Sequence, residues 1–339
     1  MKKTLLTLSA IGIVSTASLS ARELLCEQCE AEPQPCCPEY LFVERSQIYV
    51  SGEFLYWTVE EGQLDYALKE KTAPSDTAFF ATGDYKTADY DWRPGYRVGL
   101  TYYHCPKYWE MTAEYTWLFD KGTDSVTSDF IRPTRLTDAS GPFVSAKSHI
   151  DFHYHLGDFY ATRVFDPSPH VRLRFFGGLT GGYLEESLKI RYKNIFDVSE
   201  RIKEKWRFWG GGVRAGLRVD WFWGCQFYLT GKSSFATLVG KYKNEESQFR
   251  PSDKVFFGNA KYDEPRFAMH AQFLIGPSWQ IPCDCWSFEL IAAYESNIWF
   301  NLHERIRSLP DFPDQPTETL YANGLLGMHG LTLRLNLGF

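Results

Sequence analysis

Several side chains in this sequence are of types that carry out chemistry, and the most regular set is a run of histidines. His149-x-Asp151-x-His153-x-His155 alternates with apolar residues, so its polar side chains would share one face of a β-strand. Imidazole and carboxylate groups are zinc ligands. Polar residues alternate in the same way wherever a strand lines a polar interior. We expect these histidines to line such an interior and to bind no metal.

Charged residues also alternate with apolar ones in many other segments. Arg172 and Arg174 flank Leu173, and Glu110 and Glu114 bracket a similar run. If the polar faces of such strands meet around an axis, they line a lumen with fixed charges of both signs. The expected lumen-facing charges are Arg93, Arg97, Arg172, Arg174, Arg214, Arg218, Lys232, Arg334, Glu53, Asp91, Glu110, Glu114, Asp151, Glu289 and Glu295.

Signals of catalysis and of nucleotide binding are weak. The sequence has no nucleophile elbow and no Asp/His cluster spread over several strand ends. The glycines at 177–178 and 210–212 are not followed by Gly-Lys-Ser/Thr, as a phosphate-binding loop requires. With a pI of about 5.8 and scattered basic residues, nucleic acid is not an expected partner. We expect no enzyme and no cofactor.

The N-terminus predicts export from the cytoplasm. Met1-Lys2-Lys3 precedes an apolar run from Leu5 to Leu19 and the small residues Ser20-Ala21, which is the pattern of a cleavable signal peptide over residues 1–21. No later run of 18 apolar residues could form a membrane helix. An exported chain of this kind is either soluble or a closed β-barrel. An aromatic content of 17% favours the barrel, because barrels place aromatic residues in two interfacial belts.

The polar and apolar alternation of a lipid-facing strand occurs ten times. In the last segment, Leu331, Leu333, Leu335, Leu337 and Phe339 fall on one face, and a terminal Phe resembles the signal read by the outer-membrane assembly machinery. For the segment 149–156 we expect the apolar residues from Ile150 to Leu156 to face lipid. The ten expected strands are 48–56, 91–102, 109–117, 149–156, 171–183, 209–221, 226–235, 267–275, 286–295 and 331–339.

The connections between these segments are alternately short and long. Short turns are expected around 103–108, 164–170, 222–225 and 280–284, and long polar loops around 60–90, 119–147, 185–205, 241–266 and 297–325. Outer-membrane barrels have short periplasmic turns and long external loops. The sequence therefore predicts an all-β, antiparallel transmembrane β-barrel of about ten strands, within a range of 8–12. Its expected parts are the barrel at 45–339 and a Cys-rich periplasmic segment at 22–44.

Tryptophans provide a separate test of this topology. All lie near the ends of expected strands, some beside short turns and others, such as Trp57, Trp206 and Trp299, beside long loops. Since amphipathic rings favour the level of the lipid headgroups, two belts facing the membrane are expected.

The cysteines gather at one end of the expected barrel. Four precede the first strand and four lie in or beside short turns, so all would face the periplasm, where disulfides form. The alternatives are disulfides within one chain, disulfides between chains, and a zinc site through Cys26-x-x-Cys29, with which oxidation would compete. The eight are Cys26, Cys29, Cys36, Cys37, Cys105, Cys225, Cys283 and Cys285.

Three segments resemble a known family. Ser51-Gly-Glu-Phe-Leu-Tyr-Trp57, Asp91-Trp-Arg-Pro-Gly-Tyr-Arg-Val-Gly-Leu100 and Trp209-Gly-Gly-Gly-Val-Arg-Ala-Gly-Leu217 are similar to the Legionella-type and chlamydia-type major outer membrane proteins. The resemblance spans about residues 45–339. It implies a multi-pass channel of the bacterial outer membrane, with envelope lipid, the assembly machinery and, through disulfides, other copies or Cys-rich envelope proteins as partners.

The expected function is a porin-like channel for passive diffusion of small solutes or ions. Ten strands lie between the roughly 8 that fill their own interior and the 16 that leave a channel. A structural or adhesive barrel without an open pore is therefore the alternative, and a barrel enzyme is the third.

Overall fold

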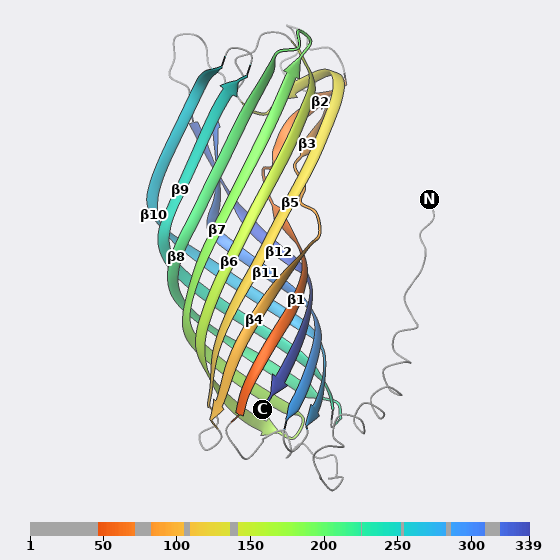
Figure 1. Cartoon of the computed structure of the whole chain (residues 1–339), viewed down its shortest axis with the longest axis vertical. Coiled ribbons are helices and arrows are strands. Elements are labelled where there is room, and N and C mark those ends of the chain that lie inside the picture. Colours follow the sequence, from red (N-terminus) through yellow and green to blue (C-terminus); the bar gives the residue numbers. More distant parts are fainter. Residues whose placement is uncertain are drawn as a thin grey trace, which may run out of the picture.

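The computed structural model describes residues 47–71, 83–104, 109–135, 142–224, 226–251, 254–282, 286–308 and 319–339. Long inclined strands around a common axis make up nearly all of these ranges (Figure 1). None of the described ranges contains a helix long and apolar enough to cross a membrane. The strands are β1 (Gln47–Glu61), β2 (Asp65–Glu70), β3 (Gly83–Thr87), β4 (Arg93–His104), β5 (Trp109–Pro133), β6 (Phe143–Ser168), β7 (Val171–Asn194), β8 (Ser199–Phe222), β9 (Phe227–Arg250), β10 (Val255–Pro282), β11 (Ser287–Ser308) and β12 (Thr319–Gly338).

In the described residues, ten strands close into one antiparallel barrel. Around the barrel the order is β5-β4-β1-β12-β11-β10-β9-β8-β7-β6, and β6 pairs back with β5. The first and last strands of the chain are neighbours, with Phe54 opposite Leu333, and the Phe339 N–H donates to the Ile48 carbonyl at 2.9 Å. The predicted antiparallel barrel of ten strands is confirmed.

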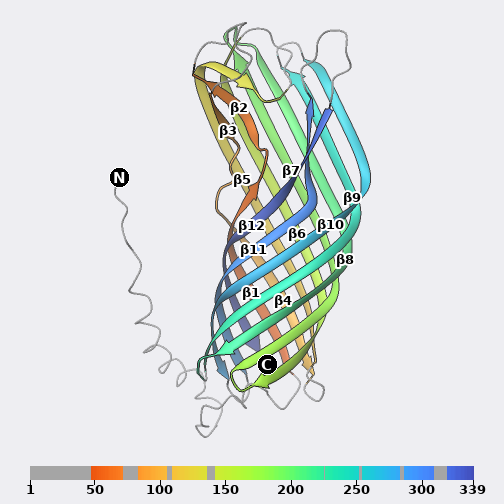
Figure 2. The ribbon, with the colours of Figure 1, turned by 180° about the vertical axis from the view of Figure 1, so that it is seen from behind.

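The short strands β2 and β3 form a hairpin that the sequence analysis did not predict. The pairing of β4 with β5 starts near the first residues of β4, with Gly95 opposite Leu118, whereas β5 continues for a further fifteen positions, to Pro133. The edge of β5 that this leaves free pairs with β2, with Leu68 opposite Arg132, and β3 pairs with β2. The hairpin lies beside the end of β5 that is far from the C-terminus, in both views (Figures 1 and 2).

A band of apolar side chains covers the outside of the barrel in its C-terminal half. These side chains are about half exposed, as expected for groups that acyl chains rather than water would contact. Arg163 stacks on Trp109 and Phe165 at the edge of the band nearest the C-terminus. The band includes Val50, Phe54, Tyr96, Val98, Leu100, Met111, Phe159, Phe175, Leu179, Val213, Phe235, Phe273, Ile275, Tyr294, Leu333 and Leu335.

The strands extend far beyond this band, and here the structure differs from the expected loops. β5 to β10 contain 24 to 28 residues each, whereas about ten suffice to cross a membrane. Much of 119–147, 185–205 and 241–266 is therefore strand. Beyond the membrane the outer face meets water, so Lys189 and Arg191 point outward while Leu188 and Ile190 are buried inside. This alternation is the reverse of the one in a lipid-facing strand. A search for lipid-facing strands therefore does not find these extensions.

One predicted strand face is wrong for the same reason. Ile150 and Phe152 are fully buried inside the barrel, and the histidine run faces outward. The section of β6 within the apolar band lies further along the chain and includes Phe159 and Phe165, both about half exposed. The expectation for β6 was placed too early in the sequence, because its true lipid-facing residues continue into the segment expected to be a turn.

Three tryptophans expected in the lipid-facing belts lie elsewhere. Trp57, Trp206 and Trp299 lie at expected strand ends but point into the barrel, where at most 2% of each is exposed. Trp92 and Trp209 face outward at the outer border of the band, and Trp109, Trp221 and Trp223 face outward at the opposite border. Two belts remain, but the outer one holds fewer rings than expected.

The predicted signal peptide at 1–21, the segment at 22–44 and all eight cysteines lie outside the described residues. The described ends that flank the short connections nevertheless lie at one end of the barrel. Tyr103 on β4 pairs with Gln47 at the start of β1, and Ser287 on β11 pairs with Gly338 near the C-terminus. The long extensions and the hairpin lie at the other end (Figure 1).

Candidate functional site

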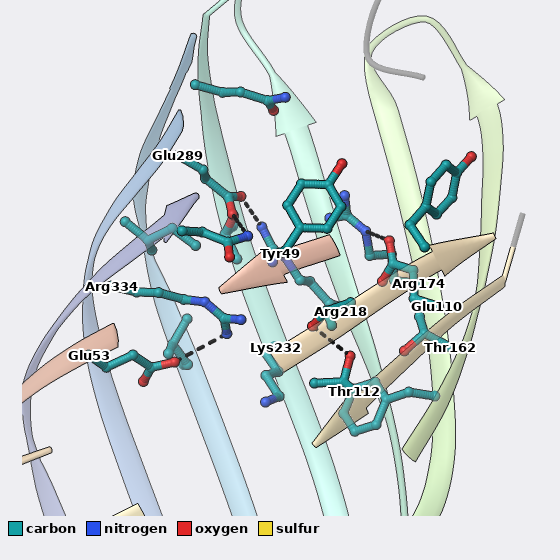
Figure 3. A pocket seen from close by; sticks show the side chains of 18 of the residues that line it. Tyr49, Glu53, Glu110, Thr112, Thr162, Arg174, Arg218, Lys232, Glu289 and Arg334 are labelled. Atoms are coloured by element: carbon teal, nitrogen blue, oxygen red, sulfur yellow. Dashed lines mark hydrogen bonds and ion pairs between the residues drawn. The ribbon is translucent and has the colours of Figure 1, made fainter. Parts of the chain in front are cut away.

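The barrel interior changes character along its axis, from a polar cavity at the C-terminal end to a layer of buried aromatic and aliphatic side chains further along. The cavity has an empty volume of about 1250 Å³, including open solvent at its mouth. Alternation on the surrounding strands sends their polar residues inward. Figure 3 shows side chains from several strands directed into this space, among them Tyr49, Glu110, Arg174, Arg218 and Glu289.

At the inner end of the cavity lies a network of ion pairs, the charge network (Arg97, Glu53, Glu295, Arg334, Glu114 and Lys232). Arg97 on β4 binds Glu53 on β1 at 2.5 Å and Glu295 on β11 at 2.8 Å. Glu53 also binds Arg334 on β12, at 3.1 Å (Figure 3). Less than a tenth of the side chains of Arg97 and both glutamates is exposed.

The rest of the network joins strands on opposite sides of the barrel. Glu114 on β5 binds Arg334 at 3.3 Å, and Lys232 on β9 lies 3.7 Å from Glu114. β9 and β5 are four steps apart around the barrel, so the pair of Lys232 and Glu114 crosses the lumen. Opposite charges held this way replace the water that would otherwise solvate them.

A second group of ion pairs lies on the cavity wall nearer its mouth. Arg218 binds Glu289 at 2.7 Å and Asp220 at 2.8 Å. Arg174 also binds Asp220, and it lies 3.6 Å from Glu110 (Figure 3). Cations and carboxylates thus largely neutralise one another along the wall.

Beyond the charge network the interior becomes apolar. We call this level the apolar layer (Trp57, Tyr154, Phe208, Trp299 and Met328); at most 1% of each of these side chains is exposed. The rings of Tyr154 on β6 and Trp299 on β11 make edge-to-face contact with centroids 6.3 Å apart. β6 and β11 are five steps apart in a ring of ten, so this contact spans the full width of the barrel.

Polar side chains anchor the apolar layer to the network below it. The Trp57 indole N–H donates to Thr332 at 3.1 Å, and Arg97 lies over the Trp57 ring at 5.7 Å. His270 stacks on Trp299 with ring centroids 4.4 Å apart, and its Nε2 lies 3.1 Å from Asn297 Oδ1. The two levels therefore form one continuous packed unit.

Most of the predicted lumen charges lie inside the barrel. Arg172 binds Asp166 near the cavity mouth, and Arg214 binds Asp158 at 2.9 Å. The other inward charges are Arg97, Arg174, Arg218, Lys232, Arg334, Glu53, Glu110, Glu114, Glu289 and Glu295.

Three predicted lumen charges are placed elsewhere, and several inward charges were missed, among them Asp158 and Asp220. Arg93 binds Asp91 at 2.8 Å, both partly exposed at the outer end of β4. Asp151 is on the outer face of β6, where it binds His149 and Lys189, each at 3.1 Å. Asp158 was missed because its strand was assigned too early. Continuing the alternation back from Phe159 would have found it.

One group of described residues has the composition of a metal site. Ligand atoms of Glu61, Glu186 and His303 lie within 4.8 Å of one another. A Glu61 carboxylate oxygen already contacts a His303 ring nitrogen, and the Tyr90 hydroxyl donates to Glu186 at 3.0 Å. These contacts fasten the segment before β4 and the end of β1 to the wall. These contacts give Glu61, Glu186 and His303 a structural role inside the barrel.

Comparisons with known proteins agree with the fold. The sequence profile of a family described as Legionella pneumophila major outer membrane protein precursor matches residues 42–336. A search among curated proteins finds no match.

Among solved structures, the outer membrane protease OmpT from Escherichia coli has a TM-score of 0.46 at 10% identity and covers 86% of this chain and 96% of its own. A TodX mutant, described as a monoaromatic hydrocarbon channel, has a TM-score of 0.32 at 8% identity and covers 88% and 91%. Likenesses at this level carry no argument about function.

Proposed function

This chain belongs to the family of the Legionella pneumophila major outer membrane protein and lies in the bacterial outer membrane; from that premise we propose that it is a structural barrel whose lumen is closed to solutes. A barrel that is packed across its width at one level and extends beyond the bilayer suits an envelope component. We assign it no catalytic role, since the lumen carboxylates Glu53, Glu289 and Glu295 each bind an arginine.

The observation that carries this proposal is the contact between Tyr154 and Trp299. A solute moving along the axis would have to separate these buried rings, which reach toward each other from opposite walls. It would then meet the ion pair of Lys232 and Glu114. Separating buried charges leaves each of them uncompensated, which costs several kcal/mol.

A diffusion channel is the second candidate, and the polar cavity favours it. The cavity opens at the C-terminal end and is lined by charges of both signs, as a pore entrance would be. In this alternative, the apolar layer would be the gate, because hydrophobic constrictions close pores by excluding water.

Single-channel recording of the full-length protein in a planar bilayer tests the proposal. We expect no conductance steps from the wild type. We expect small, intermittent current steps from the double variant Tyr154→Ala, Trp299→Ala, which removes the contact across the lumen but leaves the pair of Lys232 and Glu114 in place.

The matched control is Tyr192→Ala, Trp206→Ala, which removes the same ring types from adjacent strands and should stay silent. Steady current through the wild type would overturn the closed barrel and establish the channel. The wild-type recording decides this even if a variant fails to insert.

A further inference from the structure

The outer ends of β7, β8 and β9 present a concentrated basic surface to the outside. We call it the basic face (Lys189, Arg191, Arg201, Lys203, Arg207 and Lys243). Four of its side chains are exposed, and Arg207 and Lys243 are half-buried. The whole chain has a net charge of -6, so this cluster opposes the overall balance.

The strand register makes the cluster electrostatically unfavourable by itself. Lys189 is directly opposite Lys203, and Arg191 is directly opposite Arg201. Arg207 is opposite Lys243 on the next strand. Like charges at opposed positions of an antiparallel pair repel one another and destabilise the sheet.

Acidic neighbours offset the charge of Lys189, Arg207 and Lys243, and Asp263 on β10 is directly opposite Lys243. Asp151 lies 3.1 Å from Lys189, and Glu185 and Glu245 lie 3.7 Å and 3.8 Å from Arg207. No ion pair joins Arg191, Arg201 or Lys203 to a carboxylate among the described side chains. A polyanion from outside the protein would relieve the remaining repulsion.

The height of the basic face above the apolar band indicates where that polyanion lies. Tyr183 and Trp209 are opposite each other at the outer border of the band, which marks the membrane interface. Arg207 is two positions above Trp209, and Lys203 is six. At a rise of about 3.3 Å per residue and a tilt of about 40°, they lie roughly 5 to 15 Å above the border.

We propose that the basic face binds outer-leaflet lipids whose headgroups carry at least two phosphates. Arginine binds phosphate through two parallel hydrogen bonds, and lysine binds it as a point charge. The three like-charge pairs follow the strands over a distance larger than one phosphate, which calls for more than one anionic group. The occupant is a lipid rather than free phosphate, because the surface continues directly from the lipid-facing band.

The test uses the full-length protein in detergent micelles, with lipid adducts counted by native mass spectrometry. The probes are a bisphosphorylated glycolipid, phosphatidic acid and phosphatidylcholine. The variant Arg201→Gln, Lys203→Gln, Arg207→Gln removes one member of each like-charge pair. Its control, Lys69→Gln, Lys86→Gln, Lys121→Gln, makes the same change in net charge on β2, β3 and β5 at the same end of the barrel.

We expect the wild type and the control to bind the bisphosphorylated lipid more tightly than phosphatidic acid, and phosphatidylcholine least. The basic-face variant should bind the bisphosphorylated lipid at least about tenfold more weakly. Without lipid, the same variant should melt at a higher temperature than the wild type, since its repulsion is relieved. That rise also shows that the variant folds.

Equal affinity of the variant and the wild type would overturn the proposal. So would displacement of the lipid by inorganic phosphate at an equal phosphate concentration, which would identify a site for a free anion. Neither outcome depends on whether the lumen conducts. The lipid-binding proposal is therefore tested independently of the proposed closed barrel.

Discussion

At the residue scale, the account depends on charges that are buried and paired. Arg97 holds Glu53 and Glu295 together in the centre of the barrel, with Thr116 as a further acceptor at 2.8 Å. A buried ion pair adds little stability over an apolar replacement, but removing one partner leaves a charge without compensation.

The variant Arg97→Met should therefore lower the free energy of unfolding by about 3–5 kcal/mol. The measurement is guanidinium-induced unfolding of the protein in lipid vesicles. Arg93→Met is the control on the same strand, where a partly exposed pair with Asp91 contributes roughly 0–1 kcal/mol. Equal losses in the two variants would contradict the buried network.

Single residues were predicted from the sequence when a strand's alternation was uninterrupted. The inward charges of β4, β7, β8 and β12 follow from the apolar residues beside them. Trp57 alternates in step with the inward-facing Glu53, and Trp299 with Glu295, so the alternation places both rings inside and the expected lipid-facing belts were wrong for them. In the interior, each ring has a polar partner or a stacked ring.

At the element scale, a bulge in β11 shows how one residue can redirect a strand. The register with β12 shifts between Trp299 and His303, and Asn301 adopts a φ of 55° within this bulge. Its side-chain amide donates to the Phe267 carbonyl at 2.8 Å. The shift turns both Leu302 and His303 inward. A left-handed residue at a bulge suits Asn or Gly and disfavours β-branched residues.

Replacing Asn301 tests this local conformation. Asn301→Val should lower the melting temperature, at a cost of about 1–2 kcal/mol, whereas Asn301→Gly should stay close to the wild type. Heat-modified migration on gels measures both variants. A Val variant as stable as the Gly variant would show that the backbone there is extended.

A pair of glutamates couples the outer extensions to pH. Glu246 on β9 lies directly opposite Glu204 on β8, seven positions beyond the outward-facing Val239. Burial, and then the nearby Glu204 carboxylate, raise the pKa of Glu246 to about 7. The folded state therefore binds a proton more tightly than the unfolded chain, so stability falls as pH rises from about 4.5 to about 7.

The melting temperature of the wild type should accordingly drop between pH 5 and pH 7.5, and Glu246→Gln should reduce that drop. Glu245→Gln is the neighbouring control. The Glu245 carboxylate binds Lys261 at 2.9 Å, and this bond lowers the pKa of Glu245. The Glu245→Gln variant should therefore show the same fall in melting temperature as the wild type. An unchanged drop in Glu246→Gln would exclude this carboxylate as its cause.

At the scale of the whole molecule, one wall separates two kinds of surroundings, and its polarity inverts where they change. Within the bilayer the apolar side chains face outward and the charges face inward. Beyond it, many charges face water and the apolar side chains turn inward, where they pack around a few buried charges such as Glu204 and Arg135. The apolar layer across the lumen and the basic face both follow from this inversion.

The sequence predicted the number of strands because each membrane crossing has its own apolar stripe. It could not predict the height of the barrel, because the extensions alternate in the opposite sense and are rich in charge, as loops are. The apolar layer was missed for a related reason. Its residues come from separate strands, and only the closed ring brings Tyr154 within reach of Trp299.

Photolabelling with a lipid-soluble diazirine tests this inversion most directly. With the full-length protein in vesicles and mass spectrometry as the readout, we predict label on Phe159 and Phe165 of β6, which face the acyl chains. We predict none on Ile150, Phe152 or Tyr154 of the same strand, which are equally apolar but lie inside the barrel. Label on those three residues would contradict the account.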